Sequence, residues 1–213
     1  MRMDMNNRRQ EGFTLIELLI VIGIIGGLAA VLLPSILETD DVAKSTATEA
    51  TMIELANAAK TFNRSEGYYP NADLTYLKRS KKPAWKTDNG QNTGIESFVV
   101  MVSQSKREGT DLSGLMDNFS NTDTDQQGVE LPLLGLKYRP EITDAWGTPL
   151  VYWSKLNMNK KQMVVPSEED GPVSVSAKRR EDGMYFGQKK FQFLSAGKDL
   201  TFGTDDDIVW PSN

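Results

Sequence analysis

The sequence predicts an α+β protein in which one long N-terminal helix, with its first half embedded in a membrane, packs on a small antiparallel β-sheet. Three observations predict it. An apolar run covers residues 13–33, the stretch 35–64 contains neither Gly nor Pro, and apolar residues alternate with a period of two after residue 136. A length of 213 residues leaves room for one soluble domain of ordinary size behind the membrane segment.

The apolar run from Phe13 to Leu33 contains a single ionisable residue, Glu17. A helix rises about 1.5 Å per residue, so this run is long enough to cross a hydrocarbon core of roughly 30 Å. Basic residues precede it, which predicts a cytoplasmic N-terminus and an exported remainder; they are Arg2, Arg8 and Arg9.

Two other interpretations of this run remain open. A conventional secretory signal would be cut near Ala29–Ala30 and would release a soluble product, but its apolar core would be shorter than the run found here. An uncleaved signal anchor would stay in the membrane. The anchor gives no role to Glu17, although a charge in hydrocarbon costs several kcal/mol.

The order of a short basic leader, Gly12, the sequence Phe13-Thr-Leu-Ile-Glu17-Leu and an apolar run ending at Pro34 resembles the class III signal of type IV pilins and type II secretion pseudopilins. The resemblance implies a pilin-like fold. It also implies that prepilin peptidase removes residues 1–12, cutting after Gly12, and methylates the new amine of Phe13.

Glu17 gains a role if such helices pack side by side in a filament. In that low-dielectric interior a paired carboxylate fixes the register of neighbouring helices, whereas an unpaired one is a penalty. We therefore expect Glu17 of one subunit to meet the Phe13 amine of another. Residues 13–34 are the expected transmembrane and assembly helix, and residues 35–66 its periplasmic half.

Composition narrows the functions that the chain can have. The formal net charge of −5 argues against nucleic acid as the main partner. The chain has no Cys and no His, which removes disulfides, the usual general base, the thiol nucleophile and nitrogen or sulfur ligands for zinc. We expect no enzyme activity, and a fold held by core packing or by hard metal ions.

The long helix is expected to end near Gly67 and to bury an apolar stripe of its second half, formed by Met52, Leu55, Ala59 and Phe62. The sequence Gly67-Tyr68-Tyr69-Pro70 resembles a Gly-x-Tyr-Pro element of major pseudopilins. Residues 67–135 form a polar insertion, longer than those pseudopilins have, with a short helix expected over 95–107. The insertion is either a solvated loop or a surface that binds a partner.

Short alternating runs after residue 136 predict an antiparallel sheet of three or four strands with one face on the helix. The runs are residues 150–156, 163–166, 173–177 and 191–194. The segment Asp144-Ala-Trp146-Gly147-Thr-Pro149-Leu-Val-Tyr152 resembles an Asp-Pro-Trp-Gly-Asn-Pro-x-x-Tyr element of type II secretion major pseudopilins. We expect Trp146 to anchor the sheet, and Gly147 and Pro149 to set a turn.

The C-terminal region 136–213 ends in an acidic loop between Ser195 and Ile208, with Asp199, Asp205, Asp206 and Asp207. Oxygen-rich loops of this kind collect ligands for Ca²⁺, although a solvated acidic turn is the plainer alternative. A similar loop in major pseudopilins holds one calcium ion. The resemblance implies side-chain ligands from Asp199 and from Asp206 or Asp207, with Asp205 a further candidate and carbonyls near Ala196 completing the shell.

The resemblance implies a structural subunit of a type II secretion pseudopilus, in the bacterial inner membrane with its C-terminal domain in the periplasm. Its partners would be copies of itself, prepilin peptidase, the assembly platform and minor pseudopilins. A surface type IV pilus subunit for adhesion, motility or DNA uptake is the alternative, although many such pilins carry a disulfide that this chain lacks. A membrane-tethered binding module, with residues 70–135 recognising a ligand, is a third possibility.

Overall fold

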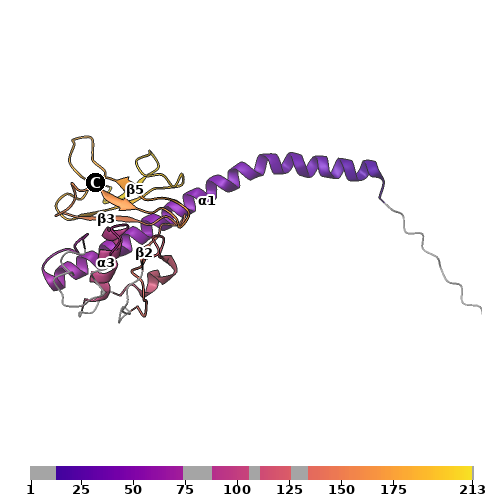
Figure 1. The fold of residues 1–213 in the computed structure, drawn as a ribbon. Helices are drawn as coiled ribbons and strands as arrows, with labels where there is room; N and C mark the ends of the chain where they lie inside the picture. The colour runs from indigo at the N-terminus through magenta and orange to yellow at the C-terminus, as the bar shows by residue number, and fades with distance from the viewer. Residues whose placement is uncertain (1–12, 74–87, 106–110, 126–133, 213) are drawn as a thin grey trace, which may run out of the picture. The chain divides into compact units, whose positions relative to one another are not determined.

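A computed structural model describes residues 13–73, 88–105, 111–125 and 134–212 (Figure 1). The chain divides into two compact units, Met1–Val42 and Ala43–Asn213. The predicted leader with Gly12, and the polar part of the insertion over 74–87, lie outside the described residues.

Helix α1 spans Leu15–Glu66. Its segment Leu15–Leu33 is the one helix among the described residues that is long and apolar enough to cross a membrane, and none of it is buried within the chain. The helix ends directly before Gly67, whose φ of 82° is the left-handed conformation that commonly stops helices. The amide of Gly67 donates to the carbonyl of Asn63 at 2.9 Å. The predicted end is confirmed.

The unit Ala43–Asn213, which we call the head, contains the main hydrophobic core. The second half of α1 forms one side of this core. Met52, Leu55, Ala59 and Phe62 are all buried, which confirms the predicted stripe. They pack in one cluster with helix α3, Thr93–Ser103, which covers most of the short helix predicted over 95–107. Residues 106–107 lie outside the described residues.

A three-stranded antiparallel sheet lies over this core, in the order β3–β6–β7. The strands are β3, Val151–Ser154; β6, Phe191–Ser195; and β7, Ile208–Trp210. Tyr152 pairs with Phe193, and Phe193 pairs with Trp210. One face of the sheet, with Tyr152, Phe191 and Phe193, joins the main core, so the predicted packing of a sheet on the helix is confirmed.

The strands that form the sheet are not all those that the sequence predicted. Strands β4, Gln162–Val164, and β5, Val173–Val175, pair only with each other among the described strands. Their Val164 and Val175 pack in a second core with Trp153 and Leu194, on the far face of the sheet. The hairpin therefore covers the sheet as a second layer, and β7 supplies the third strand instead.

Two further strands, β1, Phe119–Ser120, and β2, Glu141–Ile142, form a separate antiparallel pair that the sequence did not predict. The six-residue 3₁₀ helix Ser113–Asn118 leads directly into β1. Strands of two residues carry no periodicity of their own. The α+β class holds, with a second layer and an extra strand pair added to the predicted helix and sheet.

Candidate functional site

The N-terminal motif begins α1 with a reciprocal pair of side-chain caps. The backbone N–H and the hydroxyl of Thr14 each donate to Glu17 Oε2 at 2.8 Å, and the Glu17 amide donates to Thr14 Oγ1 at 3.3 Å. This is a capping box, in which the two residues satisfy each other's free amides. Its Thr-x-x-Glu spacing is visible in the sequence, but the prediction assigned Glu17 only to assembly. Glu17 therefore also fixes the first turn of the helix, next to Phe13.

Asp144 organises the Asp-Ala-Trp-Gly-Thr-Pro turn that precedes β3. Its Oδ1 accepts from the amides of Trp146 and Thr148, both at 3.0 Å, and its Oδ2 accepts from the Ser195 hydroxyl at 2.6 Å. The neighbouring amide of Ala145 donates to Thr48 Oγ1 of α1 at 3.1 Å. The turn is thereby tied both to the helix and to the end of β6, where the acidic loop begins.

Burial raises the pKa of Asp144, while the hydrogen bonds from Ser195 and the turn amides oppose that rise. The expected turn at Gly147 is present, with φ 93°. The expectation that Trp146 anchors the sheet was wrong, since its ring is only half-buried and belongs to neither core cluster formed by the described residues. Asp144 provides the anchor that was assigned to Trp146.

The acidic loop closes on itself through its carboxylates. Asp206 Oδ2 accepts from the Asp199 amide at 3.0 Å, and Asp206 Oδ1 accepts from the Thr204 hydroxyl at 2.7 Å. Gly197 has φ 70°, and a Cβ there would strike the carbonyl of Asp206, so only glycine allows this approach. Ala196 is fully buried, whereas Asp205 is exposed. The loop thus brings Asp206 against the backbone of Asp199.

A lysine from another segment reaches into the same loop. Lys178 Nζ donates to the carbonyl of Thr204 at 3.0 Å and to Asp207 Oδ2 at 3.1 Å. Burial raises the pKa of Asp207, and the Lys178 contact opposes the rise. This contact could not be predicted from the sequence, because Lys178 lies far from the loop along the chain. Carbonyl and carboxylate oxygens of the loop therefore already converge on one cation.

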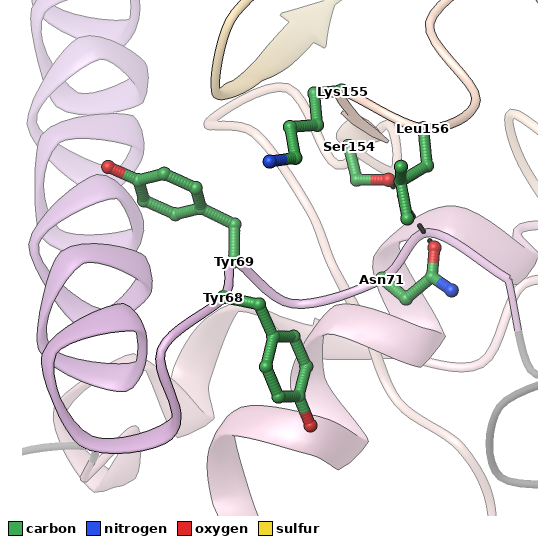
Figure 2. Close-up of a pocket in the computed structure, with 6 residues that line it drawn as sticks. All are labelled: Tyr68, Tyr69, Asn71, Ser154, Lys155 and Leu156. Atoms are coloured by element: carbon green, nitrogen blue, oxygen red, sulfur yellow. Dashed lines mark hydrogen bonds between the residues drawn. The ribbon is translucent and has the colours of Figure 1, made fainter.

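A pocket of about 270 Å³ lies where the chain leaves α1 and passes the end of β3 (Figure 2). Its lining residues are Tyr68, Tyr69, Asn71, Ser154, Lys155 and Leu156. Figure 2 shows Tyr68 and Tyr69 pointing away from each other, and the Ser154 hydroxyl donates to Asn71 Oδ1 at 3.3 Å. The buried Tyr152 hydroxyl donates to the carbonyl of Pro70 at 2.7 Å. These bonds fix the Gly67-Tyr68-Tyr69-Pro70 element against β3.

Comparison with known proteins gives a family motif at the N-terminus. Residues 7–33 match the prokaryotic N-terminal methylation motif. The match includes Thr14 and Glu17 of the capping box and the whole apolar segment Leu15–Leu33 of α1. No solved structure gave a significant match.

The relatives come from two kinds of assembly. The chain is 33% identical over 144 residues to the type IV major pilin protein PilE of Neisseria gonorrhoeae, covering 68% of this chain and 78% of that pilin. It is 34% identical over 79 residues to the type II secretion system core protein G of Pseudomonas aeruginosa, covering 37% of this chain and 56% of that protein. For core protein G of Aeromonas hydrophila the identity is 32% over 69 residues, covering 32% and 48%.

The chain thus spans about half the length of these two secretion proteins, and more than two thirds of the pilin. The methylation motif, the long apolar helix and the helix-on-sheet head agree with this similarity. The chain belongs to the family of type IV pilins and type II secretion pseudopilins.

Proposed function

We propose that this protein is a structural subunit of a type II secretion pseudopilus, a helical filament that helps to export folded proteins across the outer membrane. Before assembly it is held in the bacterial inner membrane, with its head in the periplasm. Prepilin peptidase cuts after Gly12 and methylates Phe13. The observation that carries the proposal is the methylation motif over residues 7–33, joined to a helix that is capped from Thr14 onward.

The exposed apolar surface of Leu15–Leu33 supports a filament role, because that surface needs lipid before assembly and neighbouring helices after it. Repeated head-to-tail contacts of this kind generate open helical filaments. Glu17 then meets the free amine of Phe13 in the next subunit, while inner-membrane platform proteins and minor pseudopilins complete the machinery.

The choice of a secretion filament is supported by similarity to two core G proteins, by the Asp144–Tyr152 element and by the absence of Cys. The longer alignment with the pilin PilE favours a second candidate, a surface type IV pilus subunit. Deleting the gene separates the two functions. Loss of exported proteins from the medium with surface pili intact supports the pseudopilus, whereas loss of pili with normal secretion supports the pilus.

We further propose that the acidic loop binds one calcium ion. Its side-chain ligands are Asp199 and either Asp206 or Asp207, with Asp205 a further candidate, and backbone carbonyls near Ala196 complete the shell. The oxygen atoms that already hold the ammonium of Lys178 support this proposal, since they are hard donors of the kind that Ca²⁺ prefers. Calcium at this position would replace or displace Lys178.

Calcium is expected to raise the melting temperature of the protein by about 5–10 °C when its concentration is 100-fold above the dissociation constant. A chelator should reverse the rise. The double substitution Asp199→Asn with Asp207→Asn should remove the part of the shift that comes from the loop, whereas Asp182→Asn, on an exposed turn, should not. An unchanged shift in the double variant would remove the ion from this loop.

A further inference from the structure

A second group of carboxylates lies inside the head, away from the acidic loop. It consists of Asp88, Glu96, Asp123, Asp125 and Glu141, which we call the buried acidic cluster. Its members come from α3, from β2 and from the segments beside them, and α3 and β2 lie next to each other in the head (Figure 1). The side chains of Glu96 and Glu141 are fully buried.

One side of the buried acidic cluster is compensated by Arg139, whose side chain has no exposed surface. Its guanidinium lies 2.9 Å from Asp125 Oδ2, 3.4 Å from Asp88 Oδ1 and 3.6 Å from Glu96 Oε2. Asp88 also accepts from the Gly90 amide at 3.1 Å and from the Thr93 hydroxyl at 3.2 Å. This side is an ion-pair network with its own cation.

The other side has no such cation among the described residues. Oxygen atoms of Glu96, Asp123 and Glu141 all lie within 4.8 Å of one another. Neither oxygen of Glu96 accepts a hydrogen bond there, and Asp123 Oδ2 is also buried without a donor. Glu96, a fully buried side chain without a hydrogen-bond donor, therefore faces Asp123 and Glu141, and Arg139 is the one cation that contacts it among the described residues.

Burying the negative charge of this cluster in the folded state costs free energy. Five carboxylates share one guanidinium among the described residues, so the cluster would carry a net charge of −5 + 1 = −4 with all five ionised. A buried charge without a partner is expensive, and a buried donor or acceptor without a hydrogen bond adds to that cost. A bound cation would remove both penalties together.

The geometry fits a hard divalent ion. Calcium takes oxygen ligands at 2.3–2.6 Å, so ligand atoms on opposite sides of the ion lie roughly 5 Å apart. Two donors hold Glu141 in place. The side-chain amide of Asn92 donates to Oε1 at 2.9 Å, and the backbone amide of Thr122 donates to Oε2 at 3.3 Å. Asn92 is itself buried, and both ends of its side-chain amide are hydrogen-bonded, since its Oδ1 accepts from the backbone amide of Val165 at 3.0 Å. Such outer contacts are typical of positioned metal ligands.

We propose that Glu96, Asp123 and Glu141 bind a calcium ion inside the head, between α3 and β2, with Arg139 retained on the opposite side of Glu96. This site is separate from the C-terminal loop and does not depend on the loop binding calcium. It joins α3 of the insertion to β2, and so fixes the insertion to the rest of the head.

The test uses the full chain in detergent micelles and Ca²⁺ alone as the probe, at pH 7.5. The parent variant carries Asp199→Asn and Asp207→Asn, so that the acidic loop cannot contribute to the number of calcium ions bound per chain. Equilibrium dialysis after chelator treatment is expected to give one Ca²⁺ per chain. Adding Glu96→Gln should abolish that binding, while adding Glu168→Gln, at an exposed position, should leave it unchanged.

A melting curve in chelator shows whether Glu96→Gln still folds. We expect a melting temperature at least equal to that of the parent, because Gln has nearly the same volume and cannot carry a buried charge. Asp123→Asn, on the less buried side of the cluster, is the second variant and should also abolish binding. The site would be overturned if the parent bound no calcium, or if the Glu96→Gln and Asp123→Asn variants bound as much calcium as the parent. Loss of binding in both, with folding retained, supports it.

Discussion

A chain carrying Glu17→Gln is expected to enter the membrane and to be trimmed like the wild type, but to lose filament assembly almost completely. Gln at the third helical position keeps the capping box with Thr14, because its amide oxygen can accept the same hydrogen bonds. The substitution removes only the charge that is proposed to pair with the Phe13 amine. Breaking a buried pair costs about 3–5 kcal/mol, which is enough to prevent assembly.

Thr14→Ala is the matched control, because it weakens the cap by about 1 kcal/mol and leaves the carboxylate in place. This variant should still assemble. Membrane fractionation measures insertion, and electron microscopy of sheared filaments measures assembly. Normal filaments from Glu17→Gln, together with none from Thr14→Ala, would show that Glu17 acts through the helix cap and not through charge pairing.

Arg139→Met is expected to lower the free energy of unfolding of the head by about 3–5 kcal/mol at pH 7.5 in chelator, since it removes the guanidinium that pairs with Asp88, Glu96 and Asp125. The control Arg180→Met breaks an exposed pair with Asp182 and should change stability by less than about 1 kcal/mol. Urea unfolding followed by Trp fluorescence measures both variants.

The same cluster sets the pH dependence of stability. Burial raises the pKa of Glu141 to about 7 and that of Asp125 to about 6, and raises the pKa of Glu96 well above its usual value. The folded state therefore binds more protons than the unfolded state, so these groups favour folding at low pH and lose that contribution as pH rises through about 6 to 7. In chelator, the Arg139→Met variant should regain stability between pH 8 and pH 5. Loss of stability over that interval would contradict the assigned role of the cluster.

The long helix could be predicted because its signals are local. The apolar run of Leu15–Leu33, the stripe with Met52 and Phe62, and the stop at Gly67 depend on residues close in sequence. The Thr14–Glu17 cap was equally local and could have been recognised from its spacing. Strand β7 was missed, because Ile208–Trp210 is too short for alternation to distinguish it from the flank of the acidic loop.

The contacts that complete both acidic sites could not be predicted. Lys178 meets Asp207, and Arg139 meets Glu96, only after strands and helices from distant parts of the chain have packed together. The sequence did offer one signal for the buried cluster. Glu96 is the single ionisable residue of α3, whose remaining residues are apolar or small, so a buried carboxyl group was to be expected there.

The proposed function depends most directly on the N-terminus of the mature chain. Mass spectrometry of the protein from its native membrane, with the prepilin peptidase gene present and deleted, measures it. We expect a chain that begins at N-methylated Phe13 when the peptidase is present, and one that retains residues 1–12 when it is absent. An uncleaved chain in both strains, or a chain cut near Ala30, would contradict the assembly of this protein into a filament.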